Sequence, residues 1–321
     1  MPELSLVVPV YNEYESLSLL FDAIRKSLNP LKRSWEVIFV DDGSRDESSK
    51  VLAGLFKQDP LHVRVIRFRR NFGQTAAIAA GIDHARGDVL ILLDADLQND
   101  PADIPAMLKK LDEGYDVVSG WRRNRKDSFV SRTLPSTLAN GLISLVTGVH
   151  LHDFGCTLKA YRRDVLEGFR LYGEMHRFIP VFADSVGARI TEMEVTHHPR
   201  LHGRGKYGLE RTFKVLLDLF TVKFLISFAN KPIYLFGGAG AGLALLGAVD
   251  LVYLFARRIL QDVLPNTTLL FFGIILFIIG FQSILLGLIA ELLVRTYHES
   301  QQKPTYRVRE ILESKPKKKG K

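Results

Sequence analysis

Two long apolar segments near the end of the chain place the strongest constraint on what it can fold into. Residues 233–256 are apolar apart from Asp250, and residues 269–294 are apolar over most of their length. About 20 such residues in a helix cross the roughly 30 Å hydrocarbon core of a membrane, and buried helices of soluble proteins are usually shorter. We therefore predict two transmembrane helices within residues 231–296.

The flanking charges predict how these helices are oriented. The tail at residues 297–321 is rich in lysine and arginine, whereas residues 257–268 form a short connection. Positive charge favours the cytosolic side, although Arg257 and Arg258 weaken this bias. The first apolar run, at residue 4, is not preceded by a basic segment with a cleavage site, so we expect no signal peptide and a cytosolic N-terminal part.

The remaining sequence divides into a soluble part and an interfacial segment. Residues 1–207 have the pattern of a soluble α/β domain. Residues 208–230 are apolar nearly all round but carry Arg211, Lys214, Asp218 and Lys223, which is typical of a helix lying in the membrane interface. We predict a cytosolic domain at 1–207, this interfacial helix, the two transmembrane helices and a basic cytosolic tail.

The charge balance narrows the classes of partner. The net charge is +8, which suits an anionic membrane surface or phosphorylated substrates. Aromatic residues do not alternate with the basic clusters as a surface for single-stranded nucleic acid requires, so we expect no nucleic-acid partner. Cys156 is the single cysteine, which excludes an intrachain disulfide and a cysteine metal cluster.

Short apolar runs alternate with helical patterns in the first 120 residues. The expected strands are 4–10, 35–40, 63–68, 89–93 and 117–120, and the helices between them are 14–28, 44–55, 73–85 and 101–113. Continuous apolar runs of this length are typical of strands buried on both faces, and their alternation with helices indicates βαβ units. The predicted fold class is therefore α/β with a mostly parallel sheet.

Three of these strands end in polar residues, which a parallel sheet brings to one edge. The three ends read Pro9-Val10-Tyr11-Asn12-Glu13, Asp41-Asp42-Gly43-Ser44 and Asp94-Ala95-Asp96. Open α/β sheets bind ligands at this edge, and two carboxylates one residue apart suit Mg²⁺ or Mn²⁺ shared with substrate phosphates. A solvated acidic turn or a helix cap is the alternative for Asp94 and Asp96. No Gly-x-Gly-x-x-Gly loop follows the first strand, and the sequence has no Gly-Lys-Ser/Thr phosphate loop, so metal and side chains would neutralise a bound diphosphate.

A family resemblance rests on four ordered motifs. They are Pro9-Val10-Tyr11-Asn12-Glu13, Val40-Asp41-Asp42-Gly43-Ser44, Arg70-Asn71-Phe72-Gly73 and Asp94-Ala95-Asp96-Leu97-Gln98. In this order they resemble family 2 glycosyltransferases of the GT-A fold, and more narrowly the polyisoprenyl-phosphate glycosyltransferases. The resemblance covers residues 4–210 motif by motif and the C-terminal helices in layout only. It is specific for fold and reaction class but not for the sugar.

The resemblance implies roles for the residues at the strand ends. Pro9, Tyr11, Glu13, Asp41, Asp42 and Asp94 would bind the donor nucleotide, and Asp94, Asp96 and Gln98 would surround the metal. Tyr11 could instead be a buried aromatic residue at a strand end, and Gln98 an ordinary loop residue. The Arg70-Asn71-Phe72-Gly73 motif could serve only to shape the loop above the site.

The resemblance also implies an acceptor site on the basic cluster after the fifth strand. Arg122 (or Arg123), Arg132 and Ser136 match the positions that hold the acceptor phosphate in the family, and a guanidinium fork suits phosphate. The cluster leads into a weakly amphipathic apolar segment at residues 133–149, which is typical of a membrane-facing helix. A solvated basic face is the alternative for these arginines.

Two further segments carry candidate catalytic residues. Asp153 is a candidate carboxylate near the reacting centre, although the following Gly155-Cys156-Thr157-Leu158 departs from the family pattern; an N-cap, or an ion pair with Arg162 or Arg163, is the alternative. Arg200, Gly203 and Lys206 match a basic loop that covers the donor diphosphate in the family, with Arg204-Gly205 as a departure. A metal site at His197, His198 and His202 is not expected, because adjacent residues of a strand point to opposite faces.

Together these features predict an inverting, metal-dependent enzyme integral to the inner membrane. It would transfer one sugar from a nucleotide diphosphate donor, with UDP-hexose favoured, to polyprenyl (undecaprenyl or dolichyl) phosphate at the cytosolic face. A homo-oligomer is a further possible partner. A processive polysaccharide synthase is one alternative, but it needs more membrane helices and a Gln-x-x-Arg-Trp motif, and neither is found in the sequence. A non-catalytic membrane scaffold on the same fold is the other.

Overall fold

The protein is described by a computed structural model. The structure describes residues 2–123, 134–167, 171, 175–199, 219, 233–261, 264, 266–300 and 306–314. The chain forms two compact units, one of residues 1–220 together with 304–321 and the other of residues 221–303. The predicted interfacial helix at 208–230 lies almost wholly outside the described residues.

The first unit is built on an eight-stranded sheet in the order β7-β5-β6-β4-β1-β2-β3-β8. The strands are β1 (Leu4–Val10), β2 (Trp35–Asp41), β3 (Val63–Phe68), β4 (Val89–Leu92), β5 (Val117–Trp121), β6 (Lys159–Arg162), β7 (Ile190–Glu194) and β8 (Val308–Leu312). The pairs β1–β2, β1–β4, β2–β3 and β5–β7 are parallel, whereas β6 and β8 run antiparallel to their neighbours. The predicted α/β class with a mostly parallel sheet is confirmed.

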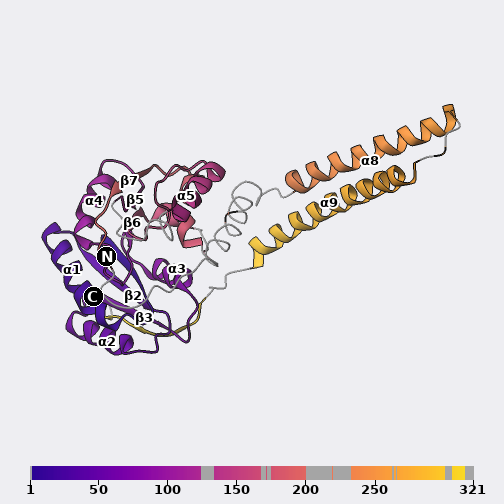
Figure 1. Cartoon of the computed structure of the whole chain (residues 1–321). Helices are drawn as coiled ribbons and strands as arrows, with labels where there is room; N and C mark the ends of the chain where they lie inside the picture. Colours follow the sequence, from indigo (N-terminus) through magenta and orange to yellow (C-terminus); the bar gives the residue numbers. More distant parts are fainter. Residues whose placement is uncertain are drawn as a thin grey trace, which may run out of the picture. The chain divides into compact units, whose positions relative to one another are not determined.

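Helices cover both faces of this sheet (Figure 1). They are α1 (Tyr14–Leu28), α2 (Ser48–Gln58), α3 (Gln74–His84), α4 (Ile104–Asp112), α5 (Leu134–Thr147) and α6 (Ile179–Ser185), with 3₁₀ turns at Asn29–Leu31, Pro101–Asp103, Asp164–Leu166 and Met175–Phe178. Leu6 and Val8 of β1 belong to the core cluster that includes α1, α2 and α4. Val7 points the other way and packs on Gly81 of α3. The central strands are therefore buried on both sides, as their continuous apolar runs predict.

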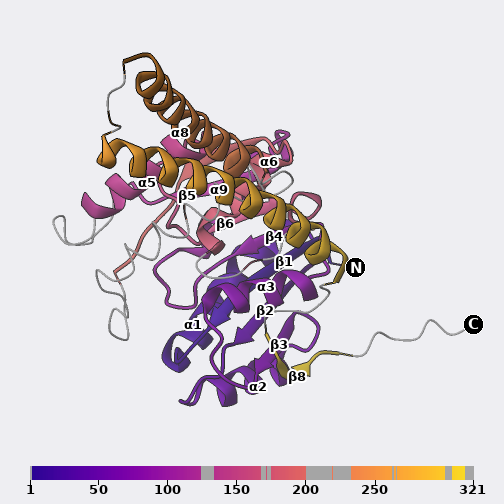
Figure 2. The same ribbon diagram turned by 90° about the vertical axis from the view of Figure 1, so that its right-hand side faces the viewer.

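Three strands were not predicted from the sequence, and each has a physical reason. β6 contains Lys159 and Arg162, so its four residues lack the pattern of a buried strand. β7 has no fully buried position. β8 comes from the basic tail and forms the edge of the sheet beside β3, as Figure 2 shows. The tail at 297–321 is thus not only a charged extension, because residues 308–312 complete the sheet of the first unit.

The second unit contains a pair of long apolar helices, α8 (Ile233–Gln261) and α9 (Thr267–Ser300), which lie side by side (Figure 1). Leu235–Gln261 and Thr267–Ala290 are long and apolar enough to cross a membrane, and only 17% and 11% of their most apolar windows are buried. Gly240 of α8 approaches α9 closely at Gly280, whereas Gly238 and Gly242 have no neighbour within 4 Å of a built Cβ. This second unit has the length and exposure expected of membrane-spanning helices.

Candidate active site

The ends of β1, β2 and β4 lie next to one another at one edge of the sheet. Pro9 of β1 is paired with Val40 of β2, and Val7 of β1 is paired with Leu92 of β4. The loops that follow these strands therefore begin side by side. The structure brings together the three polar strand ends that the sequence analysis selected.

The loops after β1 and β2 are tied to each other by hydrogen bonds from backbone N–H groups to side-chain oxygens. The Asn12 N–H donates to Oγ of Ser44 (3.0 Å), the Arg45 N–H donates to Oδ1 of Asn12 (2.8 Å), and the Glu13 N–H donates to Oγ of Ser48 (3.0 Å). Asn12 holds a left-handed backbone with φ of 54°, which asparagine tolerates better than most residues. These hydrogen bonds fix the shape of this part of the edge, which carries the candidate nucleotide-binding residue Glu13.

Asp41 is buried at the end of β2 and accepts hydrogen bonds from its own loop. Its Oδ1 accepts from the Ser44 N–H (2.9 Å), and its Oδ2 accepts from the Ser49 hydroxyl. Nε of Arg67 lies 3.7 Å from Oδ2. These contacts fix the orientation of the carboxylate at the position predicted to meet the base or ribose.

Asp42 anchors a second loop, which is the family motif at residues 70–73. Its two oxygens accept from the Phe72 N–H (2.6 Å) and the Gly73 N–H (2.9 Å). Burial raises the pKa of Asp42 to about 6, although these two hydrogen bonds act in the opposite direction. Gly43, with φ of +68°, lets the chain approach the backbone of this loop, because a Cβ there would lie 2.5 Å from the carbonyl carbon of Arg70. The close approach at Gly43 is therefore to the protein's own loop.

The carboxylates of Asp94 and Asp96 follow β4. Nε2 of Gln74 donates to Oδ1 of Asp94 (2.9 Å), and the Gln98 N–H donates to Oδ1 of Asp96 (3.2 Å). Leu97, which lies between Asp96 and Gln98, has a φ of 59°. This backbone conformation is unfavourable for leucine, costs about 1–3 kcal/mol and is typical of functional turns.

These residues fit a hard divalent cation. Among the residues that the structure describes, no group of three or more His, Cys, Asp or Glu side chains is placed to hold a metal. Mg²⁺ usually takes only one or two protein carboxylates and completes its shell with substrate phosphates and water. Two carboxylates at a ligand-binding sheet edge match this donor set, and the amide oxygen of Gln98 could add a third ligand.

The histidines after β7 hold the loop that carries Gln98. The His198 N–H donates to the Gln98 carbonyl (2.8 Å), Nε2 of His198 lies 3.0 Å from Oδ2 of Asp100, and His197 forms a β-bridge with Asn99. Both histidines therefore hold the loop that carries Gln98 in place.

The predicted acceptor residue Arg122 and the predicted catalytic residue Asp153 are bound to each other. Nε of Arg122 lies 2.7 Å from Oδ2 of Asp153, and Nη2 lies 3.0 Å from Oδ1. Only 13% of the Arg122 side chain and 4% of the Asp153 side chain are exposed. Burial alone would lower the pKa of Arg122, but Asp153 raises it well above its usual value.

Asp153 therefore forms an ion pair, but its partner is Arg122 and not Arg162 or Arg163. Arg162 donates to the carbonyls of Leu111 and Tyr115, and Arg163 donates to those of Ala85 and Gly87. Arg123, the other candidate at this position, is exposed and pairs with Glu194 through Nη1 at 2.6 Å. Of the two arginines, Arg122 is the one that points into the buried part of the site.

Several predicted residues lie where the structure gives no side-chain description. Arg132, Arg200 and Lys206 are outside the described residues, and Ser136 lies on α5 without a described side chain. The acceptor and leaving-group roles of these four residues stay predictions.

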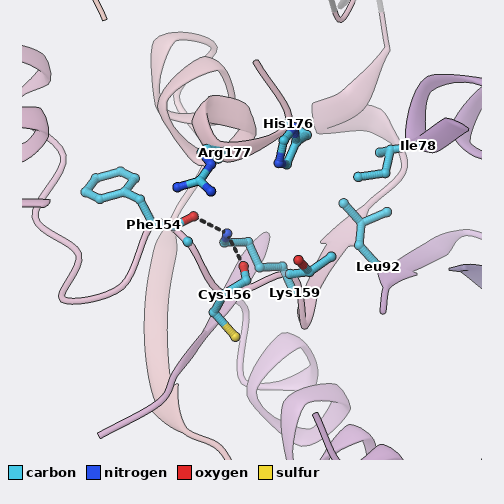
Figure 3. Close-up of a pocket in the computed structure, with 9 residues that line it drawn as sticks. Ile78, Leu92, Phe154, Cys156, Lys159, His176 and Arg177 are labelled. Atoms are coloured by element: carbon cyan, nitrogen blue, oxygen red, sulfur yellow. Dashed lines mark hydrogen bonds between the residues drawn. The ribbon is translucent and has the colours of Figure 1, made fainter. Parts of the chain in front are cut away.

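The sequence analysis missed a basic pocket beside Asp153 (Figure 3). It has a volume of about 10 Å³, room for about one water molecule, and is lined by Ile78, Leu92, Phe154, Gly155, Cys156, Thr157, Lys159, His176 and Arg177. Lys159 is buried on β6 and donates to the carbonyls of Phe154 (3.0 Å) and Cys156. Burial lowers the pKa of Lys159 to about 8. Lys159 comes from β6, whereas His176 and Arg177 come from the turn at Met175–Phe178, so sequence spacing gave no signal for them.

Comparisons with known proteins agree on one family. The model of a family described as glycosyl transferase family 2 matches residues 5–169. The dodecaprenyl-phosphate galacturonate synthase of Rhizobium johnstonii is 44% identical over 97% of this chain and 93% of its own length. The undecaprenyl-phosphate 4-deoxy-4-formamido-L-arabinose transferase of Pseudomonas fluorescens is 38% identical over 97% of this chain and 91% of its own.

Solved structures share the fold. The glucosyl-3-phosphoglycerate synthase of Mycobacterium tuberculosis, solved with Mn²⁺ and UDP-glucose, aligns with a TM-score of 0.52 at 18% identity, covering 69% of this chain and 79% of that one. Residues 1–349 of Staphylococcus aureus TarS, solved with UDP-GlcNAc, align with a TM-score of 0.51 at 18% identity, covering 70% and 66%. These likenesses show a GT-A-like arrangement of the sheet and helices.

Proposed function

The chain belongs to glycosyl transferase family 2, and from this membership we propose that it transfers one sugar from a nucleotide diphosphate donor to the phosphate of a polyprenyl lipid. The observation that carries the proposal is the match to relatives named for transfer to polyprenyl phosphate, which extends over 97% of the chain and so includes the two apolar helices. A donor carrying UDP is favoured, since solved structures of the same fold were obtained with UDP sugars.

The strand edge would hold the donor. Asp41, fixed by Ser44 and Ser49, would accept hydrogen bonds from the base or ribose. The loop with Tyr11 and Glu13 would close one side of the nucleotide, and Asp94 and Asp96 would face the diphosphate. A Mg²⁺ or Mn²⁺ ion held by these two carboxylates and Gln98 would supply positive charge to the departing diphosphate.

The acceptor needs little activation, because a lipid phosphate already carries negative charge at neutral pH. Its oxygen would form a bond to the anomeric carbon while the bond from that carbon to the nucleotide diphosphate breaks, and in-line attack inverts the configuration. Arg122 would orient the phosphate through its remaining N–H donors, with Asp153 fixing the plane of the guanidinium. Arg132, Ser136, Arg200 and Lys206 keep their proposed roles toward the acceptor and the leaving group.

Location follows from the same reaction. We propose that α8 and α9 anchor the chain in the inner membrane with the sheet-containing unit in the cytosol, where nucleotide sugars are made. Residues 208–230 would lie in the membrane interface. A homo-oligomer is part of the same proposal. A polysaccharide synthase and a scaffold gain no support from the comparisons, since both named relatives are transferases or synthases of lipid-linked monosaccharides.

A donor screen tests the proposal directly. Purified full-length protein would be incubated with Mn²⁺ or Mg²⁺, undecaprenyl phosphate and each labelled nucleotide sugar, and lipid-extractable label would be counted. Asp96→Ala should abolish the label, whereas Asp112→Ala, a surface carboxylate paired with Arg33, should not. Label found only in long polymer would favour the synthase, and no transfer from any donor would overturn the proposal.

A further inference from the structure

Arg67 connects the candidate donor site to the C-terminal strand. It is paired in register with Asp41 of β2 on one side and with Glu310 of β8 on the other. Its Nε lies 3.7 Å from Oδ2 of Asp41, and its Nη1 lies 3.0 Å from Oε2 of Glu310. One guanidinium group is therefore shared between a carboxylate of the candidate site and a carboxylate from the tail of the chain.

Glu310 holds the outer part of this guanidinium. The side chain of Asp41 is 2% exposed, that of Arg67 is 27% exposed and that of Glu310 is 46% exposed. The contact with Glu310 occupies Nη1, while Nε faces Asp41. Opposite charges on directly facing residues of neighbouring strands attract each other. Loss of Glu310 therefore leaves Arg67 to turn fully onto Asp41, where it competes with the hydrogen-bond donors of a bound nucleotide.

An aromatic chain connects Asp42 to the same tail. The buried ring of Tyr306 stacks on Phe68 at the end of β3, with ring centroids 5.2 Å apart. Phe68 meets Phe72 edge to face at 5.6 Å, and the Phe72 N–H donates to Oδ1 of Asp42 (2.6 Å). The loop that Asp42 anchors thus rests on Tyr306 through one intermediate aromatic residue.

The tail is fastened to both ends of β3, which separates its contacts into two groups. Near the candidate site, the Tyr306 hydroxyl donates to Oδ2 of Asp83 on α3 (2.9 Å). At the other end, Glu313 pairs with Arg64, near the start of β3, and with Arg86, which precedes β4. The carboxyl ends of the parallel strands carry the candidate site, so Glu313 lies on the side of the sheet away from it.

We propose that Tyr306 and Glu310 are positioning residues of the donor site, so that nucleotide affinity depends on docking of the C-terminal strand. The proposal rests on the proposed function, in which Asp41 and Asp42 belong to the nucleotide site. Groups that are already ordered lose less conformational freedom when a ligand binds, so loss of their support weakens binding. Because α9 ends at Ser300, six residues before Tyr306, this strand also links the donor site along the chain to the apolar helices.

Nucleotide binding to matched variants provides the experiment. Full-length protein in detergent would be titrated calorimetrically with UDP, GDP, CDP and ADP in the presence of Mn²⁺, and the nucleotide that binds wild type most tightly would be used for every variant. Tyr306→Ala should raise its dissociation constant about tenfold and Glu310→Gln about threefold. Tyr306→Phe keeps the ring and should stay within about twofold of wild type. In sugar transfer the donor KM should rise in the same order, while kcat and the lipid KM stay within about twofold.

Glu313→Gln is the matched control on the same strand. It weakens the tail at the far end of β3, so it should lower the thermal midpoint and leave the dissociation constant unchanged. Wild-type affinity in both Tyr306→Ala and Glu310→Gln would overturn the inference, and so would an equal loss of affinity in Glu313→Gln, which would indicate a general loosening of the fold. The proposed function survives both results, because wild type still binds nucleotide. Failure of wild type to bind any of the four nucleotides would overturn the proposed function and this inference together.

Hydrogen exchange tests the same coupling without a substitution. If the docked tail strengthens nucleotide binding, a bound nucleotide must stabilise the docked tail by the same factor. Nucleotide with Mn²⁺ should therefore slow amide exchange at residues 308–312 at least about threefold more than at β7, on the opposite edge of the sheet. Equal slowing at the two edges would contradict the inference even if the variants bind nucleotide weakly.

Discussion

Arg122 and Asp153 form a two-pronged ion pair in which Nε and Nη2 of the arginine face the two carboxylate oxygens at 2.7 and 3.0 Å. The pair joins the end of β5 to the turn before β6. Because both side chains are nearly buried, each charge depends on the other for its stability in the fold. A residue expected to bind the acceptor and one expected to act near the reacting centre are therefore a single unit.

This pairing predicts that loss of either partner lowers both stability and transfer. Asp153→Asn leaves a buried guanidinium without its counter-charge, and it should lower the free energy of unfolding by about 3 kcal/mol. Thermal unfolding followed by tryptophan fluorescence would measure this, because both tryptophans, Trp35 and Trp121, lie in the sheet-containing unit.

The double variant Arg122→Gln/Asp153→Asn distinguishes a structural role from a functional one. It removes both charges and should recover part of the lost stability, but transfer should stay at least about 100-fold below wild type if Arg122 orients the acceptor phosphate. Recovery of transfer together with stability would mean that the pair only supports the fold.

Asp42 gives the site a dependence on pH. Its carboxylate accepts the N–H groups of Phe72 and Gly73, and burial raises its pKa to about 6. Protonation weakens these hydrogen bonds, so kcat/KM should fall as the pH drops through 6. Asp42→Asn should remove this step from the pH profile of sugar transfer, and a profile unchanged by the substitution would contradict the assignment.

Stability should respond to Asp42 in the opposite direction. The folded-state pKa lies above the ordinary value of 3.8, so between these two values the folded protein binds more protons than the unfolded chain. The contribution of Asp42 to stability is therefore present at low pH and is lost as the pH rises from about 4 to about 6. Thermal midpoints of wild type and Asp42→Asn across this range would show the difference.

The C-terminal strand predicts that the sheet-containing unit is incomplete without the end of the chain. Glu313 pairs with Arg64 (2.8 Å) and Arg86 (2.6 Å), and the Tyr306 hydroxyl donates to Asp83. Truncation after residue 305 exposes the edge of β3 and removes a partner of the buried Arg64. We expect the thermal midpoint of this unit to fall by about 5–10 °C.

A second truncation provides the matched control. Ending the chain after residue 314 removes the terminal lysines but keeps β8, and it should leave the midpoint within about 1 °C of wild type. Equal losses in the two truncations would show that the terminal charges, and not the strand, provide the stability.

The sequence predicted the central sheet well because strands buried on both faces must be continuous apolar runs. The same reasoning fails at β6, where Lys159 is buried because its ammonium group meets the carbonyls of Phe154 and Cys156. Such satisfaction depends on a turn of the folded chain and leaves no periodic signal. β8 was not predicted for a different reason, since its partner β3 lies more than 200 residues away in the sequence.

The residues of the candidate site also differ in how well the sequence predicts them. The strand-end carboxylates Asp41, Asp94 and Asp96 were found because parallel strands bring their carboxyl ends to one edge. The partner of Asp153 was not found, because β6 runs antiparallel beside β5 and brings residue 153 back to Arg122. Local patterns identify residues at an edge, whereas side-chain pairs across it depend on how the later strands are inserted.

Cys156 predicts a clean chemical probe of the region beside the basic pocket. Its side chain is buried, with 1% of the residue exposed, and burial raises the pKa of the thiol to about 11. Because the thiolate is the reactive form, the folded protein should resist maleimide at pH 7 for hours and react within minutes in denaturant.

Cys156→Ala should show no labelling in either state. Lys57→Cys in that background places a thiol on an exposed position of α2 and should react at once. Rapid labelling of Cys156 in the folded protein would mean that the turn between Asp153 and β6 opens readily, and the ion pair with Arg122 would then be open for much of the time.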